Sequence, residues 1–171
     1  MARQSGQKAK LLILRDFLLR NADEEHPVST AALIAELARH GVSAERKSIY
    51  TDMETLVEQG VDVQQLRGRG GGWFVGEREF ELPELKLLVD AVQSSRFISR
   101  KKSSELIAKL EGLTSVGQAR QLHRQVYVDQ RVKTLNEGVY YAIDQLHTAI
   151  AEGRAVEFHY FDYDVARQRV F

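Results

Sequence analysis

Residues 42–56 limit the possible folds of this chain more than any other stretch, because their two faces differ in chemistry. Ile49, Met53 and Leu56 recur at i, i+4 and i+7, which is the spacing of one apolar stripe along an α-helix. Ser43 stands just before the predicted helix, where its hydroxyl could accept a backbone N–H of the first turn. The pattern predicts an amphipathic helix with one buried and one exposed face.

The exposed face of this predicted helix has side chains that suit the major groove of DNA. Lys47, Ser48 and Thr51 lie opposite the apolar stripe, and Arg46 and Tyr50 lie at its edge. Serine and threonine can reach base edges, while arginine, lysine and tyrosine can hold phosphates or read guanine. An ordinary amphipathic surface helix has the same spacing, so the neighbouring segments have to decide between the two interpretations.

Two helices are predicted before this one. Residues 7–21 place leucines among basic residues, and we expect this basic amphipathic helix to pack in a helical domain rather than on a membrane. A second helix begins at Ser29 or Thr30 and runs to His40, where Gly41 stops it. Two helices joined by a turn that contains glycine indicate a helix-turn-helix, and Thr30 could then donate to a phosphate from a helix start.

A glycine-rich hairpin is predicted directly after the helix. Residues 61–66 alternate like a strand, residues 73–75 can pair with them, and the glycines between the two supply a tight tip. A hairpin in this place is a wing, and Arg67 and Arg69 would reach phosphates or the minor groove from it. A nucleotide-binding loop does not fit, because Trp73 breaks the G-x-G-x-x-G spacing and no Lys-Ser/Thr pair follows.

The second half of the chain predicts further helices and an incomplete domain. Pro83 suits the first turn of a helix, and aliphatic residues then recur three times at helical spacing. The basic run at residues 100–102 is expected to be a solvated turn. Asn136 can cap one more helix, residues 155–161 alternate like a strand, and a second strand opens near residue 168. One short hairpin is not a stable sheet, so a new domain begins here.

Composition excludes several functions. The chain has 24 basic and 24 acidic residues, so any attraction to nucleic acid has to come from a local basic edge. Cysteine is absent, which excludes thiol catalysis and cysteine-ligated zinc and fits the cytoplasm. The histidines are scattered, no catalytic constellation is visible, and no apolar run could span a membrane. We expect no enzyme, no cofactor, no metal and no membrane partner.

The order of these segments resembles the WYL-domain transcriptional regulators of bacteria. Arg46-Lys47-Ser48-Ile49-Tyr50-Thr51-Asp52 is similar to the recognition-helix motif of that family. Residues 70–74 and 78–86 are similar to its wing and first linker helix, and residues 149–163 to the entry of its WYL domain. The chain departs from the family at two points. Thr51 stands where arginine is common, and the Trp-Tyr-Leu signature is absent because Trp73 is the only tryptophan.

The resemblance implies a mainly α fold in three parts: a winged helix-turn-helix at residues 1–76, a helical linker at 77–135, and the start of an α+β, Sm-like effector domain at 136–171. It implies a regulator that binds double-stranded DNA, in a chain truncated early in its effector domain. A nucleotide-type or nucleic-acid effector would bind only a full-length form. We also expect a homodimer. The predicted DNA-binding residues are Thr30, Arg46, Lys47, Ser48, Tyr50, Thr51, Arg67 and Arg69. The alternative is a protein-interaction or dimerisation module that uses the same fold without binding DNA.

Overall fold

The computed structural model describes residues 6, 9–68, 70–125, 133–136, 138–158, 162–163 and 169–170. Within these residues the chain is mainly helical, with seven helices and two antiparallel sheets of two strands each. The helices are α1 (Lys10–Asn21), α2 (Thr30–Arg39), α3 (Arg46–Glu58), α4 (Leu82–Ser94), α5 (Arg100–Glu111), α6 (Val116–Gln125) and α7 (Gly138–Ala151). The strands are β1 (Val63–Leu66), β2 (Gly72–Val75), β3 (Asp162–Tyr163) and β4 (Arg169–Val170).

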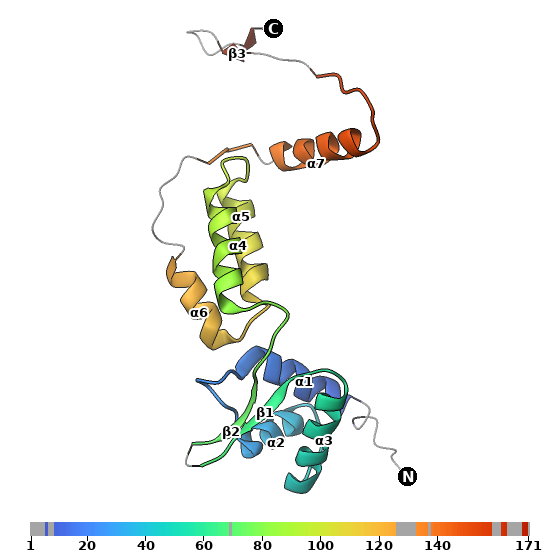
Figure 1. Cartoon of the computed structure of the whole chain (residues 1–171), viewed down its shortest axis with the longest axis vertical. Helices are drawn as coiled ribbons and strands as arrows, with labels where there is room; N and C mark the ends of the chain where they lie inside the picture. Colours follow the sequence, from blue (N-terminus) through green and yellow to red (C-terminus); the bar gives the residue numbers. More distant parts are fainter. Residues whose placement is uncertain are drawn as a thin grey trace.

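The elements follow one another along an elongated molecule (Figure 1). The first three helices and the β1–β2 hairpin gather at one end, α4 and α5 lie side by side in the middle, and α7 crosses the far end. No helix of the described part is long and apolar enough to cross a membrane. The seven described helices confirm the expected mainly helical class. In Figure 1, α3 lies at the end of the molecule that the later helices leave open.

One hydrophobic core holds the first end together. The apolar stripes of α1, α2 and α3 point into it, and residues of the β1–β2 hairpin complete it. All its buried members lie between residues 14 and 75: Leu14, Leu18, Ala22, Leu33, Leu37, Val42, Ile49, Met53, Leu56, Val63, Trp73, Phe74 and Val75. The later helices do not contribute to this core, so the first end packs as a unit.

The turn between α2 and α3 differs from the prediction in one detail. Ser29 caps α2 as expected, because its hydroxyl accepts from the backbone N–H of Ala32 at 3.2 Å. Gly41 ends the turn of α2 with a φ of +72°, in the left-handed region. The expected cap of α3 is wrong: Glu45 is its N-cap residue, without a side-chain cap bond, and Ser43 lies two residues earlier.

The predicted hairpin is confirmed. β1 and β2 pair antiparallel from Val63 opposite Val75 to Leu66 opposite Gly72. The chain before α2 joins the same sheet edge, since the backbones of Val28 and Trp73 exchange two hydrogen bonds of 2.8 Å. Gly72 is required at this crossing, because a Cβ atom there would lie 2.4 Å from the carbonyl oxygen of Val28. The hairpin is therefore fixed against the start of α2.

The helical middle begins at Pro83, in the first turn of α4 as predicted. Glu81 and Glu84 form a capping box there. The basic run at residues 100–102 is not the expected turn but the first turn of α5, which Ser99 caps by accepting from the backbone N–H of Lys102. A serine N-cap satisfies the free N–H groups of that turn, and this outweighs the charge of the run. The buried apolar residues of this part are Leu85, Val89, Ile107 and Leu122.

A polar joint connects the two parts. Asp23 is 3% exposed and accepts from the backbone N–H groups of Glu25 and His26, while Ser115 at the start of α6 donates to its other oxygen. Arg78 donates to the carbonyl oxygens of Leu19 and Ala22 at 2.8 and 2.7 Å. These bonds satisfy the C-terminal end of α1 and attach it to the helical middle.

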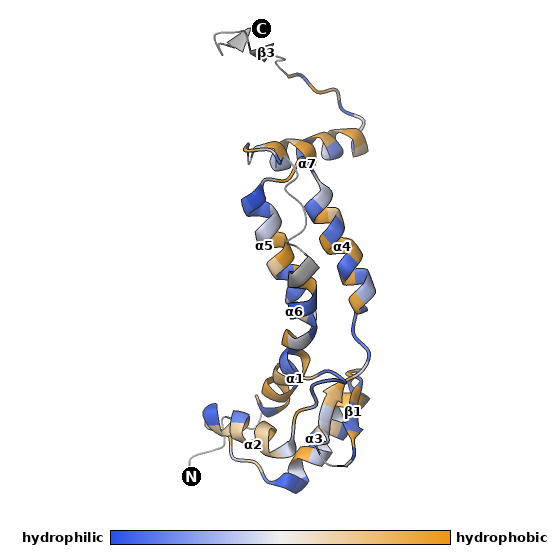
Figure 2. Cartoon of the chain, turned by 90° about the vertical axis from the view of Figure 1, so that its left-hand side faces the viewer, coloured by the Kyte–Doolittle hydropathy of each residue, from blue (hydrophilic) through white to orange (hydrophobic). Residues whose placement is uncertain are grey.

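The last described segments pack little. Asn136 accepts from the backbone N–H of Gly138 at 2.8 Å, as the predicted cap requires, but no residue of α7 is buried although hydrophobic residues run along it (Figure 2). Residues 155–158 are exposed and form no strand, so this part of the predicted strand is wrong. A strand needs a pairing partner for its backbone, and none of the described strands pairs with this segment. Residues 159–161 lie outside the described residues.

Candidate nucleic-acid interface

The polar face of α3 is open to a partner. The buried stripe turns Ile49, Met53 and Leu56 inward, with exposed fractions of at most 4%. Lys47 and Thr51 lie on the opposite side of the helix and are exposed, as predicted. No later helix lies over this face in either view (Figures 1 and 2). The face can therefore meet a large, regular surface without a rearrangement of the fold.

A groove lies beside this face, between the starts of α2 and α3 and the β1–β2 hairpin. We call it the hairpin groove; its volume is about 470 Å³. Four of the predicted DNA-binding residues, Thr30, Arg46, Tyr50 and Arg67, line it together. No aspartate or glutamate is among its lining residues, so the groove is locally basic although the whole chain is neutral. Among the described residues, its lining is Ser29, Thr30, Ala31, Ile34, Arg46, Tyr50, Gln65, Leu66, Arg67, Gly68, Gly71 and Gly72.

The hydroxyl of Tyr50 is the polar centre of the hairpin groove. Hydrogen bonds from the side chains of Arg46 and Gln65 lower the pKa of Tyr50 from its usual value of 10.0, and Thr30 contributes to the same shift. These groups come from α3, β1 and α2, so one hydroxyl joins three elements. The cationic surroundings that favour a phenolate also favour any other anion at this point.

Trp73 fixes two residues that line the hairpin groove, Thr30 and Tyr50. Its indole Nε1 donates to the hydroxyl of Thr30 at 3.0 Å, and the edge of its ring meets the ring of Tyr50 with centroids 5.1 Å apart. Both contacts are directional, and the ring is 7% exposed. The sequence prediction placed Trp73 in the second strand of the hairpin and gave it no contact with α2 or α3. Its position opposite Gln65 in the hairpin register is what brings it to α2 and α3.

Ser48 does not join Lys47 and Thr51 on the exposed face. It is half-buried at the α1 edge, where its hydroxyl donates to the carbonyl oxygen of Glu45 at 2.8 Å and accepts from the ammonium of Lys10 at 3.0 Å. The prediction that Ser48 faces outward is therefore wrong, because position 48 lies on the edge of α3 that meets Lys10 of α1. Of the other predicted residues, Arg69 lies outside the described residues.

Two residues in contact with this region were missed. The sequence analysis gave Lys10 no role beyond that of a basic residue in its helix, but Lys10 is 5% exposed and shares the stripe of Leu14 and Leu18 at i, i+4 and i+8. That spacing was visible in the sequence and could have identified it. No such pattern in the sequence pointed to Gln65, since exposed positions of a strand are commonly polar.

The charge of α3 divides along its length. Arg46 and Lys47 stand in the first turn, while Glu54 and Glu58 are exposed in the second half. A polyanion would therefore be attracted to the N-terminal half of the helix and repelled from the C-terminal half. The helix dipole adds to the positive potential at the same end.

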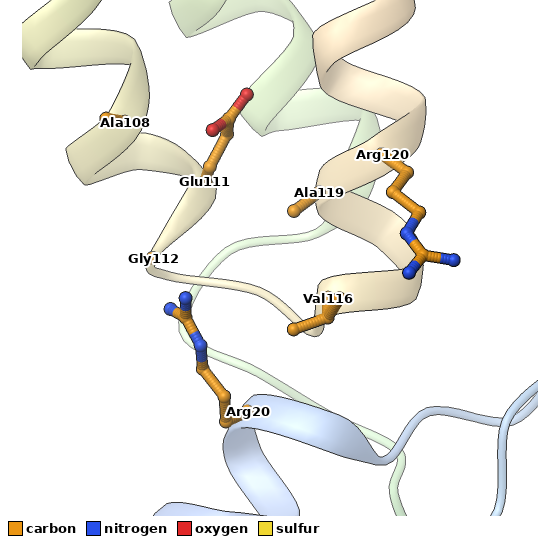
Figure 3. Close-up of a pocket in the computed structure, with 7 residues that line it drawn as sticks. All are labelled: Arg20, Ala108, Glu111, Gly112, Val116, Ala119 and Arg120. Carbon is orange, nitrogen blue, oxygen red and sulfur yellow. The ribbon is translucent and has the colours of Figure 1, made fainter.

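A second hollow, of about 570 Å³, lies between α1, α5 and α6 (Figure 3). Arg20, Glu111 and Arg120 line it, and the two guanidinium groups lie on opposite sides of the hollow. Small side chains, Ala108, Val116 and Ala119 among them, line the rest. Because the cations do not converge, this hollow lacks the geometry of an anion site.

The described residues assemble no metal centre. They contain no group of three or more histidine, aspartate or glutamate side chains that could hold a metal ion. Asp23, His26 and Ser115 do meet, with Nδ1 of His26 2.8 Å from Oδ1 of Asp23. Ser115, however, donates to the carboxylate of Asp23 and not to the imidazole, so the three residues do not have the serine–histidine–aspartate order of a catalytic triad.

No protein-family model, no curated protein and no solved structure matches this chain significantly. The resemblance to the WYL-domain regulators therefore stays a prediction from the residues that carry it. The geometry of α3 and the hairpin groove is the basis on which a function can be inferred.

Proposed function

We propose that this chain is a winged helix-turn-helix protein that binds double-stranded DNA sequence-specifically. It would act as a transcriptional regulator in the bacterial cytoplasm. In this proposal α2 and α3 form the helix-turn-helix, and the β1–β2 hairpin is the wing. The observation that supports it most is the convergence of Thr30, Arg46, Tyr50 and Arg67 on one groove without acidic residues.

The hairpin groove would hold the phosphate backbone. Arg46 and Arg67 supply guanidinium groups from α3 and the hairpin, and Ser29, Thr30 and Ala31 at the N-terminus of α2 line the same space. Such contacts fix the register of a protein on DNA without reading the sequence. The acid-free lining matters here, because a carboxylate at this place would repel the phosphate.

The exposed face of α3 would read base pairs. With a phosphate in the hairpin groove, the N-terminal half of α3 lies against the duplex, and Lys47 and Thr51 are its outward side chains. Lysine can donate to O6 and N7 of guanine, and threonine can bond a base edge or contact the methyl group of thymine. The acidic second half of α3 would point away from the duplex.

The helical middle and α7 would serve association. Leu87 on α4 and Tyr141 and Ile150 on α7 are large apolar side chains that are 70%, 64% and 75% exposed. This observation favours a homodimer, and it also favours the alternative function, a dimerisation module that does not bind DNA. In a dimer, two α3 helices could meet two half-sites.

Two substitutions test whether α3 reads base pairs while the hairpin groove holds phosphate. Lys47→Ala should relax the preference at one base pair, by about 1–3 kcal/mol, if Lys47 reads guanine. Arg67→Ala should weaken binding to all duplexes alike and make the dependence on salt less steep. Fluorescence anisotropy with a selected and a scrambled duplex measures both effects. Arg154→Ala removes the same charge at the far end of α7 and should change neither.

Equal losses on both duplexes for Lys47→Ala and Arg67→Ala would show that α3 does not read bases. Unchanged binding in both variants would show that neither Lys47 nor Arg67 contacts DNA. A wild-type chain that binds no duplex would favour the dimerisation module instead.

A further inference from the structure

We propose that Lys10 is a positioning residue for sequence discrimination: its buried ammonium fixes the rotation of α3 and so sets which bases Lys47 and Thr51 reach. This inference rests on the proposed DNA binding and concerns the same face of α3. Lys10 itself would not touch DNA.

The contacts of Lys10 form a two-point grip on α3. Its Nζ lies 3.0 Å from Oγ of Ser48 and 2.5 Å from Oδ2 of Asp52, and these two residues stand one turn apart on the same edge of the helix. Ser48 is fixed in turn by its bond to the carbonyl oxygen of Glu45. Two polar contacts one turn apart resist both sliding and rolling of a helix, since each has a preferred direction.

Burial of Lys10 and of Oδ2 of Asp52 makes these contacts stronger and their geometry more specific. Lys10 is 5% exposed, and a lysine is almost never buried unless its charge is paired. Oδ2 of Asp52 is also buried, and within the described residues it has no hydrogen-bond partner besides this ion pair. Each charge therefore depends on the other. An apolar pair could fill the same space, but it would hold α1 against α3 without defining the rotation of α3.

The opposite edge of α3 is held by the ring contact between Tyr50 and Trp73. With Lys10 on one edge and Trp73 on the other, the exposed face of α3 has one orientation relative to the hairpin groove. If the phosphate is held in that groove, a roll of α3 would move Lys47 and Thr51 relative to the base pairs. Lys10 therefore acts on sequence discrimination and not on attraction to the backbone.

The test separates these two properties. A preferred duplex is first selected from a random pool with the wild-type protein, and affinities for this duplex and a scrambled one are then measured across a salt series. For Lys10→Met the ratio of the two affinities should fall about tenfold, which is the value of one well-placed base contact. The affinity for the scrambled duplex and its salt dependence should stay within about twofold, because Lys10 makes no phosphate contact.

Two further variants keep the result interpretable. Arg15→Met removes the same charge from an exposed position of α1, where Arg15 pairs only with Asp16 in the described structure, and should leave the ratio unchanged. The double variant Lys10→Met with Asp52→Leu leaves no unpaired buried charge, so it should fold even if the single variant does not. It lacks the grip and should lose discrimination to the same extent as Lys10→Met.

The outcomes are distinct. Full discrimination in the folded double variant would overturn the positioning role while leaving DNA binding in place. An equal loss on both duplexes with a reduced salt dependence would show instead that Lys10 contacts phosphate. If the wild-type protein binds no duplex at all, the proposed function fails and the inference fails with it.

Discussion

Asp23 shows how one residue can join two parts of the molecule. Burial raises the pKa of its carboxyl group, but hydrogen bonds from Ser115 and His26 and the charge of His26 outweigh burial, so the net shift is downward from 3.8. A carboxyl group whose pKa is lower in the folded state stabilises the fold above its unfolded pKa. That contribution is lost as the pH falls through the lowered folded value.

Asp23→Asn should therefore cost stability at neutral pH, and the cost should shrink as the solution is acidified below about pH 4. Chemical unfolding of both proteins at several pH values measures the difference in free energy. The matched control is Glu24→Gln, because the side chain of Glu24 is exposed and makes none of these bonds in the described structure. A difference between Asp23→Asn and wild type that stays constant down to pH 3 would show that the carboxylate charge does not stabilise the joint.

At the scale of elements, the hydrophobic periodicity of the sequence predicted the helix or strand whose one face is buried. The spacing of Ile49, Met53 and Leu56 was sufficient for α3, and the alternation before a run of glycines was sufficient for the hairpin. Both patterns reflect burial of one face, which the sequence records directly. Gly72 adds a reason that the sequence does not reveal, namely the close approach of Val28.

Features that depend on a distant partner were not predictable in the same way. The grip of Lys10 on Ser48 spans 38 residues, and the bond from Trp73 to Thr30 spans 43. The missing strand at residues 155–158 has the same cause, because alternation indicates a strand only if another strand pairs with it. The residue types of the hairpin groove were therefore predicted, but their convergence was not.

The element least supported by its neighbours is α7. None of its residues is buried, and Leu146 and Ile150 on one face are 42% and 75% exposed. If this face covers a second copy of the chain, Ile150→Glu should reduce self-association measured by sedimentation equilibrium, because a charge would enter an apolar contact. His147→Glu, which places the same charge elsewhere on the exposed helix, should have a weaker effect. A strictly monomeric wild-type protein would contradict the expected homodimer.

At the scale of the whole molecule, neutrality and local charge act together. Equal numbers of acidic and basic residues give the chain no general attraction to polyanions. The basic residues of the hairpin groove and the first turn of α3 are concentrated at one end, and the joint at Asp23 and Arg78 connects that end to the helical middle. In the proposed function, this arrangement restricts DNA binding to a single edge of an elongated protein.

The affinity of the wild-type chain for duplex DNA across a salt series tests the proposed function most directly. A few phosphate contacts from Arg46, Arg67 and their neighbours should make the logarithm of the affinity fall linearly and steeply with the logarithm of the salt concentration. Binding to a selected duplex should exceed binding to a scrambled one throughout. No binding to any duplex at low salt, or the same affinity at low and high salt, would contradict the account.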